Sequence, residues 1–292
     1  MNSTAEEIAS QPACWRKALE LAASSPAGLP ASGERLAVIG CGTSLFMARA
    51  YAALRERAGH GETDAWPASE FPAHRRYDRV LAFTRSGTTT ELLAALESVP
   101  AGVPTTAITA DAGTPVASAA REVLVLDFAD ERSVVQTRFP TSLLVLLRAH
   151  LGQDVSRLPA LAERAVHAPL PAGATGYRQY TFLGTGWAAA IANEAGLKIR
   201  EAAQAWAEAY PAMEYRHGPI SVADASSLVW FFGPPPEGLE ADVRRTGAAV
   251  ELSTADPLVD LIRAQRLAVE VAVARGLDPD RPRNLARSIV LP

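Results

Sequence analysis

The chain has few cysteines, little net charge and no long apolar run, and each shortage argues against a class of protein. Cys14 and Cys41 form neither a disulfide framework nor a metal-ligand motif. A net charge of -4 over 292 residues argues against a nucleic-acid-binding surface. No apolar stretch reaches the length of a membrane span, and the polar start MNSTAEEIASQP is unlike a signal peptide. We therefore expect a soluble, cytoplasmic protein that contacts neither nucleic acid nor membrane.

Short apolar strands alternate with helices, after a first helix at 5–23 and a linker rich in Pro, Gly and Ser. In the first half the predicted strands are 36–40, part of 63–71, 79–84, 105–110 and 122–128. Three helices are predicted: 44–58, one that begins at 86, and 133–151. Thr43 or Ser44 is expected to cap the first of them. Short turns between these elements imply right-handed crossovers, so the pattern predicts a parallel sheet.

The pattern restarts after residues 152–175, a stretch rich in Pro, Ala and Gly that makes the best domain boundary. A strand at 179–184 ends in glycine and is followed by GTGWA, as the strand at 36–40 is followed by GCGTS. The later elements are a helix at 187–204, strands at 205–210, 227–233 and near 250, and helices at 240–248 and 257–275. We predict four segments: an N-terminal helix and linker at 1–33, α/β units at 34–151 and 176–292, and a linker at 152–175.

The helix at 187–204 carries three ionisable residues, Glu194, Lys198 and Glu201, at positions i, i+4 and i+7. At 3.6 residues per turn they share one side of the helix. The rest is mostly Ala, Ile, Leu and Gly, which indicates a largely buried helix. A charged stripe on a buried helix needs a partner, a ligand or a cleft. The alternative is a solvated face with one Glu–Lys pair.

Two turns in the first half have the features of an anion-binding site. In VIGCGTS a strand runs into Gly-x-Gly-x-Ser and a helix, so the backbone N–H groups around Gly42, Thr43 and Ser44 suit an anion. A dinucleotide fingerprint competes with this interpretation, although Leu45 stands where it needs a third glycine. A tight turn without a ligand is the other alternative. Cys41 is interpreted as a small buried residue rather than a nucleophile.

The second turn, AFTRSGTTTE, again joins a strand to a helix. Its hydroxyl side chains are Thr84, Ser86, Thr88 and Thr89. Gly87 lets the backbone approach a ligand closely, and Arg85 adds a charge suited to phosphate. The hydroxyl groups could instead be helix caps. Because open α/β sheets bind ligands at the carboxyl ends of their strands, the two turns predict one phosphate-binding crevice.

Two other stretches stand out by composition. His217 lies in a Gly/Pro turn within AYPAMEYRHGP rather than on an apolar helix face, which favours a functional role. The tail DPDRPRNLARSIVLP is rich in proline and arginine before an apolar end, and composition alone indicates a loose, solvated terminus.

The chain resembles the sugar isomerase (SIS) family through five motifs in the family's order: Gly-Cys-Gly-Thr-Ser, Arg-Ser-Gly-x-Thr-x-Glu, Glu-x-x-x-Lys-x-x-Glu, Arg-His-Gly-Pro and Arg-Asn-Leu-Ala. The resemblance runs roughly from Leu36 to the end. It is similar to the tandem-SIS isomerase half of glutamine–fructose-6-phosphate amidotransferases, to phosphosugar isomerases and to aminosugar-phosphate deaminases. This implies two tandem flavodoxin-like units, each a three-layer αβα arrangement with a mainly parallel sheet.

The resemblance also implies roles for single residues. The family's phosphate loop matches Ser44, Thr84, Ser86 and Thr89, with Arg85 where the amidotransferases have glutamine and deaminase-like relatives have arginine. A sugar-lining backbone segment matches 134–137, beginning at Val134. The family's catalytic helix matches Glu194, Lys198 and Glu201. Its ring-opening histidine matches His217, which in the family reaches the active site of the partner subunit, so we expect a homodimer.

Two departures from the family pattern bear on the activity. No glutaminase domain precedes residue 36, so we do not expect amidotransferase activity. The family's tail lysine, which forms a Schiff base, is Arg287 here, and a guanidinium cannot form an imine. We therefore expect Arg287 to serve binding and gating.

These observations predict a phosphosugar isomerase that needs no cofactor or metal. Glu201 would move a proton between C1 and C2 of an open-chain sugar phosphate, Lys198 would stabilise the oxyanion and Glu194 would hold Lys198. His217 would assist ring opening. Three alternatives remain: an aminosugar-phosphate deaminase or deglycase, a non-catalytic phosphosugar-binding regulator, and a nucleotide-dependent oxidoreductase.

Overall fold

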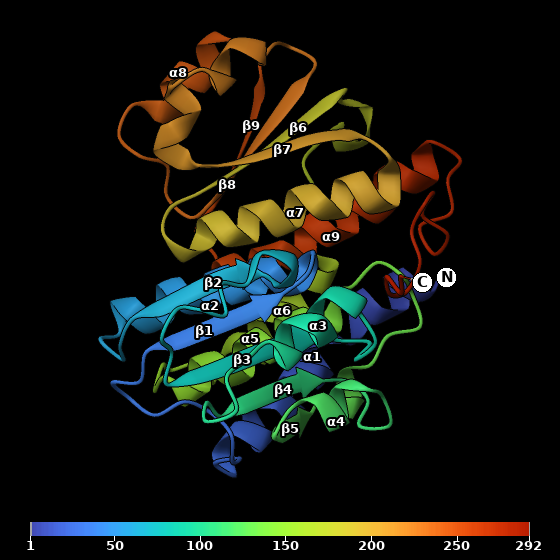
Figure 1. Cartoon of the computed structure of the whole chain (residues 1–292). Helices are drawn as coiled ribbons and strands as arrows, with labels where there is room; N and C mark the ends of the chain where they lie inside the picture. Colours follow the sequence, from blue (N-terminus) through green and yellow to red (C-terminus); the bar gives the residue numbers. More distant parts are fainter. Residues whose placement is uncertain (1, 292) are drawn as a thin grey trace. The chain divides into compact units, whose positions relative to one another are not determined.

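The computed structural model describes residues 2–291, and its strands and helices follow the predicted alternation (Figure 1). The chain divides into two compact units. We call one the first-sheet unit; it contains Ser10–Arg132, Gln136–Pro159 and the chain from Ala286 onward. The other is the second-sheet unit, which contains the chain up to Ala9, Ser133–Val135 and Ala160–Leu285. Each unit is built on one parallel β-sheet, which confirms the predicted α/β class.

The first-sheet unit has five parallel strands in the order β2-β1-β3-β4-β5. They are β1 (Leu36–Gly40), β2 (Thr63–Pro67), β3 (Arg79–Thr84), β4 (Thr105–Thr109) and β5 (Glu122–Val125). The chain moves outward from β1 to β2 and then returns to place β3 on the other side of β1. The strand order therefore reverses between β1 and β3, and such a switch point is where open α/β sheets bind ligands.

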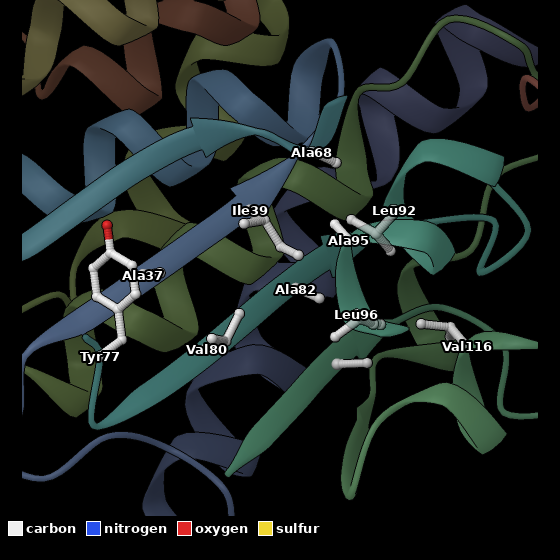
Figure 2. Close-up of a cluster of buried hydrophobic side chains, with 11 residues drawn as sticks. Ala37, Ile39, Ala68, Tyr77, Val80, Ala82, Leu92, Ala95, Leu96 and Val116 are labelled. Atoms are coloured by element: carbon white, nitrogen blue, oxygen red, sulfur yellow. The ribbon is translucent and has the colours of Figure 1, made fainter. Parts of the chain in front are cut away.

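Helices accompany this sheet as α1 (Ser3–Ala23), α2 (Thr43–Arg57), α3 (Thr90–Glu97), α4 (Val116–Ala119) and α5 (Arg138–His150). Strands β1 and β4 are buried along their whole length, so both faces of these strands are covered, as is typical of a parallel sheet. Figure 2 shows one of these faces. There Ile39 of β1 and Val80 of β3 belong to one buried cluster with Leu92 and Leu96 of α3.

The second-sheet unit has four parallel strands in the order β7-β6-β8-β9. They are β6 (Gln179–Gly184), β7 (Trp206–Pro211), β8 (Ser227–Phe232) and β9 (Ala249–Ser253). The other helices are α6 (Leu158–His167), α7 (Trp187–Ala203), α8 (Leu239–Arg245) and α9 (Pro257–Ala274). Helix α7 lies beside α9 (Figure 1). Helix α9 starts where predicted because Asp256 accepts a hydrogen bond from the Leu258 N–H, at 3.0 Å, and Pro257 takes the first helical position.

The two units repeat one local design at the end of their first strands. Gly42 and Gly186, the N-cap residues of α2 and α7, have nearly the same backbone angles, with φ 53° and ψ -123° against φ 61° and ψ -131°. The strands before them end in Gly40 and Gly184. A Cβ on Gly184 would lie 2.3 Å from the Ala188 backbone, so the helix packs against a bare strand end.

Several predicted boundaries are wrong in detail. Helix α5 begins at Arg138 instead of 133, because the Glu131 carboxylate accepts hydrogen bonds from the Thr137 and Arg138 N–H groups and so defines the helix start. Strand β5 ends at Val125, and α8 ends at Arg245. Helix α6 lies within 152–175, where the sequence predicted only a linker. The N-cap of α2 is Gly42, not Thr43 or Ser44.

None of the helices formed by residues 2–291 combines the length and the apolar character that a bilayer span requires. Over the same residues, no group of three or more His, Cys, Asp and Glu side chains is arranged to hold a metal ion.

Candidate active site

Three charged side chains of α7 form one ion-paired cluster. The Lys198 Nζ lies 3.2 Å from Glu194 Oε1 and 2.5 Å from Glu201 Oε2. The side chains of Glu194 and Lys198 are 0% and 1% exposed, whereas that of Glu201 is 19% exposed. The predicted one-sided stripe on a buried helix is confirmed, and a solvated face is wrong. Glu201 is the member of the cluster whose carboxylate is open to a ligand.

The cluster keeps Lys198 charged. Burial by itself lowers the pKa of a lysine, but the carboxylates of Glu194 and Glu201 outweigh burial and raise the pKa of Lys198. An ammonium that stays protonated at neutral pH cannot act as a nucleophile or a base. It can donate hydrogen bonds and stabilise negative charge that develops next to it.

His217 lies in an exposed turn of the second-sheet unit. The turn follows a short 3-10 helix, η4 (Ala212–Arg216), and precedes another, η5 (Pro219–Val222). Tyr215, which is fully buried in a core cluster with Leu183 and Phe231, anchors η4 just before the histidine. The His217 N–H donates to the Glu214 carbonyl at 3.0 Å. The structure therefore leaves the imidazole at the surface, and its predicted role across a subunit interface stays a prediction.

The two predicted anion-binding turns lie at the switch point of the first sheet. Parallel pairing places Gly40 of β1 opposite Phe83 of β3, so the turns that follow these strands are neighbours. The side chains of Thr43, Ser44 and Thr84 are buried. Cys41 is half-buried, not buried as predicted, and burial, followed by the Glu91 carboxylate, raises the pKa of its thiol.

The hydroxyl groups of these turns do not cap the helices. Thr89 is the N-cap residue of α3, yet neither this cap nor that of α2 includes a side-chain hydrogen bond. Instead, the Thr84 hydroxyl accepts a hydrogen bond from the Gly87 N–H at 3.1 Å, which shapes the turn itself. Capping therefore does not explain the concentration of serine and threonine, and helix N-termini without side-chain caps are suited to anions.

Gly87 is the tightest point of the second turn. Its φ is +65°, and a Cβ there would lie 1.9 Å from the Thr114 hydroxyl oxygen and 2.8 Å from the Thr114 Cβ. We expect Gly87→Ala to lower the free energy of unfolding by about 2 kcal/mol, because strain at positive φ adds to the clash. Urea unfolding measures this loss. Gly102→Ala is the matched control, since its Cβ would meet nothing within 4 Å; equal stability of the two variants would contradict the turn geometry.

The backbone of the C-terminal segment, residues 286–291, is hydrogen-bonded to the second turn, although most of its side chains are exposed. The Arg85 Nη2 donates to the Arg287 carbonyl at 2.7 Å, and the Thr90 N–H donates to the Ile289 carbonyl at 3.1 Å. The Arg287 side chain is 46% exposed and its Nη2 contacts Asp130 Oδ1 at 2.5 Å. The predicted looseness of the terminus is wrong, because backbone groups of Arg287 and Ile289 are bound by the β3–α3 turn. Its predicted solvation is confirmed, because Ile289, Val290 and Leu291 are exposed.

Residues 133–137, which contain the predicted sugar-lining segment, have no regular structure: 133–135 are bends, and 136–137 lead into α5. Val134 is half-buried, whereas Thr137 is fully buried. The Ser133 hydroxyl donates to the Val135 carbonyl at 2.8 Å and also to the Glu7 carboxylate. The segment is therefore irregular backbone held by side chains, which is compatible with the predicted role.

Sequence reasoning missed Glu131. Its side chain is fully buried, and one carboxylate oxygen accepts hydrogen bonds at the start of α5 while the other lies 3.8 Å from Arg85 Nη1. Glu131 stands seven positions before the first residue of α5, outside the positions of a capping box, so neither this role nor its contact with Arg85 is visible in the sequence.

Comparison with known proteins gives a family match over much of the first-sheet unit. Residues 31–149 match the SIS domain family, and both turns lie within the matched region. The glutamine–fructose-6-phosphate aminotransferase (isomerizing) of Methanothermobacter thermautotrophicus is 30% identical over 88% of this chain and 52% of that protein. The chain thus spans about half the length of the curated relatives it matches.

Solved structures share the fold over nearly the whole chain. The glucosamine-6-phosphate deaminase of Thermotoga maritima has a TM-score of 0.84 at 24% identity and covers 99% of this chain and 100% of its own. The tagatose-6-phosphate ketose/aldose isomerase of Escherichia coli has a TM-score of 0.78 at 20% identity and covers 99% of this chain and 96% of its own. At these identities the likeness defines the fold.

Proposed function

We propose that this chain is a phosphosugar aldose/ketose isomerase that moves a proton between C1 and C2 of an open-chain sugar phosphate. The cluster on α7 carries this proposal. Such a reaction needs a carboxylate that reaches the substrate and a cation that stabilises the enediolate oxygen. Glu201 is the partly exposed carboxylate, and the raised pKa of Lys198 keeps the cation charged. The SIS domain and the printed names of the relatives support the same chemistry.

Each residue of the cluster has a defined part. Glu201 takes a proton from one carbon and returns it to the neighbouring carbon. The Lys198 ammonium donates to the oxygen on which negative charge develops. Glu194 is a positioning residue, because its buried carboxylate holds the ammonium in place at 3.2 Å. His217, contributed by a second copy of the chain in a homodimer, assists opening of the sugar ring.

We assign the phosphoryl group to the turns at the switch point of the first sheet. The ligands are the backbone around Gly42, Thr43 and Ser44 together with the hydroxyl groups of Ser86 and Thr89. Thr84 shapes the turn, while Arg85 adds positive charge, and Val134 and Arg287 belong to the sugar-binding surroundings. Binding energy from the phosphate orients the reacting carbons.

We also propose that residues 176–292 form a second SIS-type unit, so that the chain is a tandem of two. The order β7-β6-β8-β9 repeats the order β2-β1-β3-β4, all strands parallel. The matching backbone angles of Gly42 and Gly186 support the same duplication.

Solvent exchange tests the proposed activity. The protein is incubated in D2O with fructose 6-phosphate, tagatose 6-phosphate and glucosamine 6-phosphate, and proton NMR follows each sugar. We expect deuterium to enter C1 or C2 of at least one sugar phosphate as its isomer forms, because the base exchanges its proton with solvent. Binding of these sugars with no exchange in any of them would contradict an isomerase and favour a phosphosugar-binding regulator.

An aminosugar-phosphate deaminase is the second candidate, which the printed name of the Thermotoga maritima structure favours, since that protein shares the fold over 99% of this chain. Enolisation by Glu201 is common to both reactions, and the deaminase then expels the amine. Ammonia released from glucosamine 6-phosphate, measured by a coupled assay, distinguishes this activity from isomerisation.

A further inference from the structure

We propose that Arg85 is a positioning residue that holds the C-terminal segment (residues 286–291) on the β3–α3 turn, and that through this segment it sets the conformation in which the turn binds phosphate. The second half of this inference rests on the function proposed above. That Arg85 holds the C-terminal segment does not depend on that function and is tested without any ligand.

Hydrogen bonds, rather than apolar burial, hold the C-terminal segment. The side chains of Ile289, Val290 and Leu291 are 45%, 68% and 53% exposed, so they add little to its binding. Four hydrogen bonds join the segment to the turn: Arg85 Nη2 to the Arg287 carbonyl at 2.7 Å, Thr88 Oγ1 with Ser288 Oγ at 2.8 Å, the Thr90 N–H to the Ile289 carbonyl at 3.1 Å and the Leu291 N–H to Thr90 Oγ1 at 2.9 Å. Of the four, the bond from Arg85 has a charged donor, and charge-assisted hydrogen bonds are the strongest kind.

The guanidinium of Arg85 lies beside the buried carboxylate of Glu131. Its side chain is fully buried, as is that of Glu131, and Nη1 lies 3.8 Å from Glu131 Oε2. Glu131 cannot easily move, because its other oxygen accepts hydrogen bonds from the N–H groups of Thr137 and Arg138 at the start of α5. The planar fork of arginine thus has one arm beside a fixed carboxylate and the other on the C-terminal segment.

Both the backbone and the side chain of Arg287 hold the C-terminal segment in place. Arg85 binds its backbone carbonyl, and Asp130, the neighbour of Glu131, binds its side chain at 2.5 Å. Arg85 and Asp130 therefore bind the same residue of the tail. The hydrogen bonds of Thr88 and Thr90, the two neighbours of Thr89, connect the segment to the phosphate turn. A buried guanidinium that ends on a backbone carbonyl acts on phosphate through the segment, not by direct contact.

Limited proteolysis tests the holding role. Trypsin cleaves the Arg287–Ser288 bond, and the carbonyl of this bond is the group that Arg85 binds. We expect Arg85→Met to speed cleavage there by about tenfold, because a charge-assisted hydrogen bond is lost. Cleavage of the Arg283–Asn284 bond, followed by mass spectrometry in the same digest, is the internal control and should not change.

A second variant controls for the chance that Arg85→Met destabilises the whole protein. Arg85→Met leaves the buried Glu131 carboxylate without a cation, so Arg85→Met/Glu131→Gln removes both charges and keeps an oxygen for the start of α5. The double variant should show the same faster cleavage at Arg287. Unchanged cleavage at Arg287 in both variants, with circular dichroism like that of the wild type, would overturn the proposal.

A double-mutant cycle with the tail tests the link to phosphate. Arg85→Met is made in the full chain and in a chain that stops after Leu285, and binding of inorganic phosphate is measured by calorimetry. We expect about tenfold weaker binding in the full chain and no further weakening in the shortened chain, because Arg85 acts through the removed segment. Equal weakening in both chains would show direct contact with phosphate and overturn this role. If the wild type binds no phosphate, the proposed function fails, while the proteolysis result still decides the holding role.

Discussion

Replacing Glu201 with glutamine is expected to lower kcat by about a thousandfold while the protein stays folded. The amide keeps the size of the side chain and still accepts a hydrogen bond from Lys198, but it cannot take a proton from carbon. Lys198 keeps its buried partner Glu194 at 3.2 Å, so most of the cluster survives the change. Initial rates on the sugar phosphate found by deuterium exchange measure the effect, and circular dichroism checks the fold.

The matched control is Glu237→Gln, which makes the same chemical change at an exposed position of the second-sheet unit. Its kcat should equal that of the wild type. A Glu201→Gln protein that exchanges deuterium as fast as the control would remove Glu201 from the mechanism.

Replacing Lys198 with methionine is expected to lower the free energy of unfolding by about 3–5 kcal/mol and to abolish measurable turnover. The loss of stability arises because the Glu194 carboxylate, 0% exposed, is left buried without its cation. The loss of turnover arises because no ammonium stabilises the developing oxyanion. Urea unfolding and initial rates measure the two effects separately.

The double variant Glu194→Gln/Lys198→Met separates the effect of Lys198 on stability from its effect on turnover. With both charges removed, we expect much of the stability to return, because the penalty of an unpaired buried carboxylate is gone. Turnover should stay absent. Recovery of turnover together with stability would show that Lys198 has only a structural role.

The same cluster predicts a pH dependence of stability. The carboxylates raise the pKa of Lys198 in the folded protein above the ordinary lysine value of about 10.4. Between these two values the unfolded chain has lost the proton while the folded protein holds it. The stabilisation is therefore complete below about pH 10.4 and decreases as pH rises through the folded pKa. Lys198→Met should lack this part of the alkaline decrease in unfolding measurements.

Local sequence pattern was sufficient for the elements that hold the site. Apolar runs ending in glycine predicted β1 and β6, and the spacing of Glu194, Lys198 and Glu201 predicted one face of α7. These features depend on residues within one or two helical turns of each other, and backbone geometry alone brings them together. The start of α5 was mispredicted because residues 133–137 fit the helix pattern that follows them, while the Glu131 carboxylate binds the N–H groups of Thr137 and Arg138 and so defines the start at Arg138.

The sequence alone thus predicted the charged residues on one face of α7 and the location of the two turns. Their burial, which turns a charged stripe into a desolvated ion-paired cluster, was decided only by folding, since burial depends on what packs over the helix. The contact of Arg85 with Arg287 spans 202 positions of the chain. Hydrophobic periodicity cannot predict a pairing at that separation, because the pairing arises from the path of the whole backbone. Only the tertiary structure brings the tail onto the β3–α3 turn.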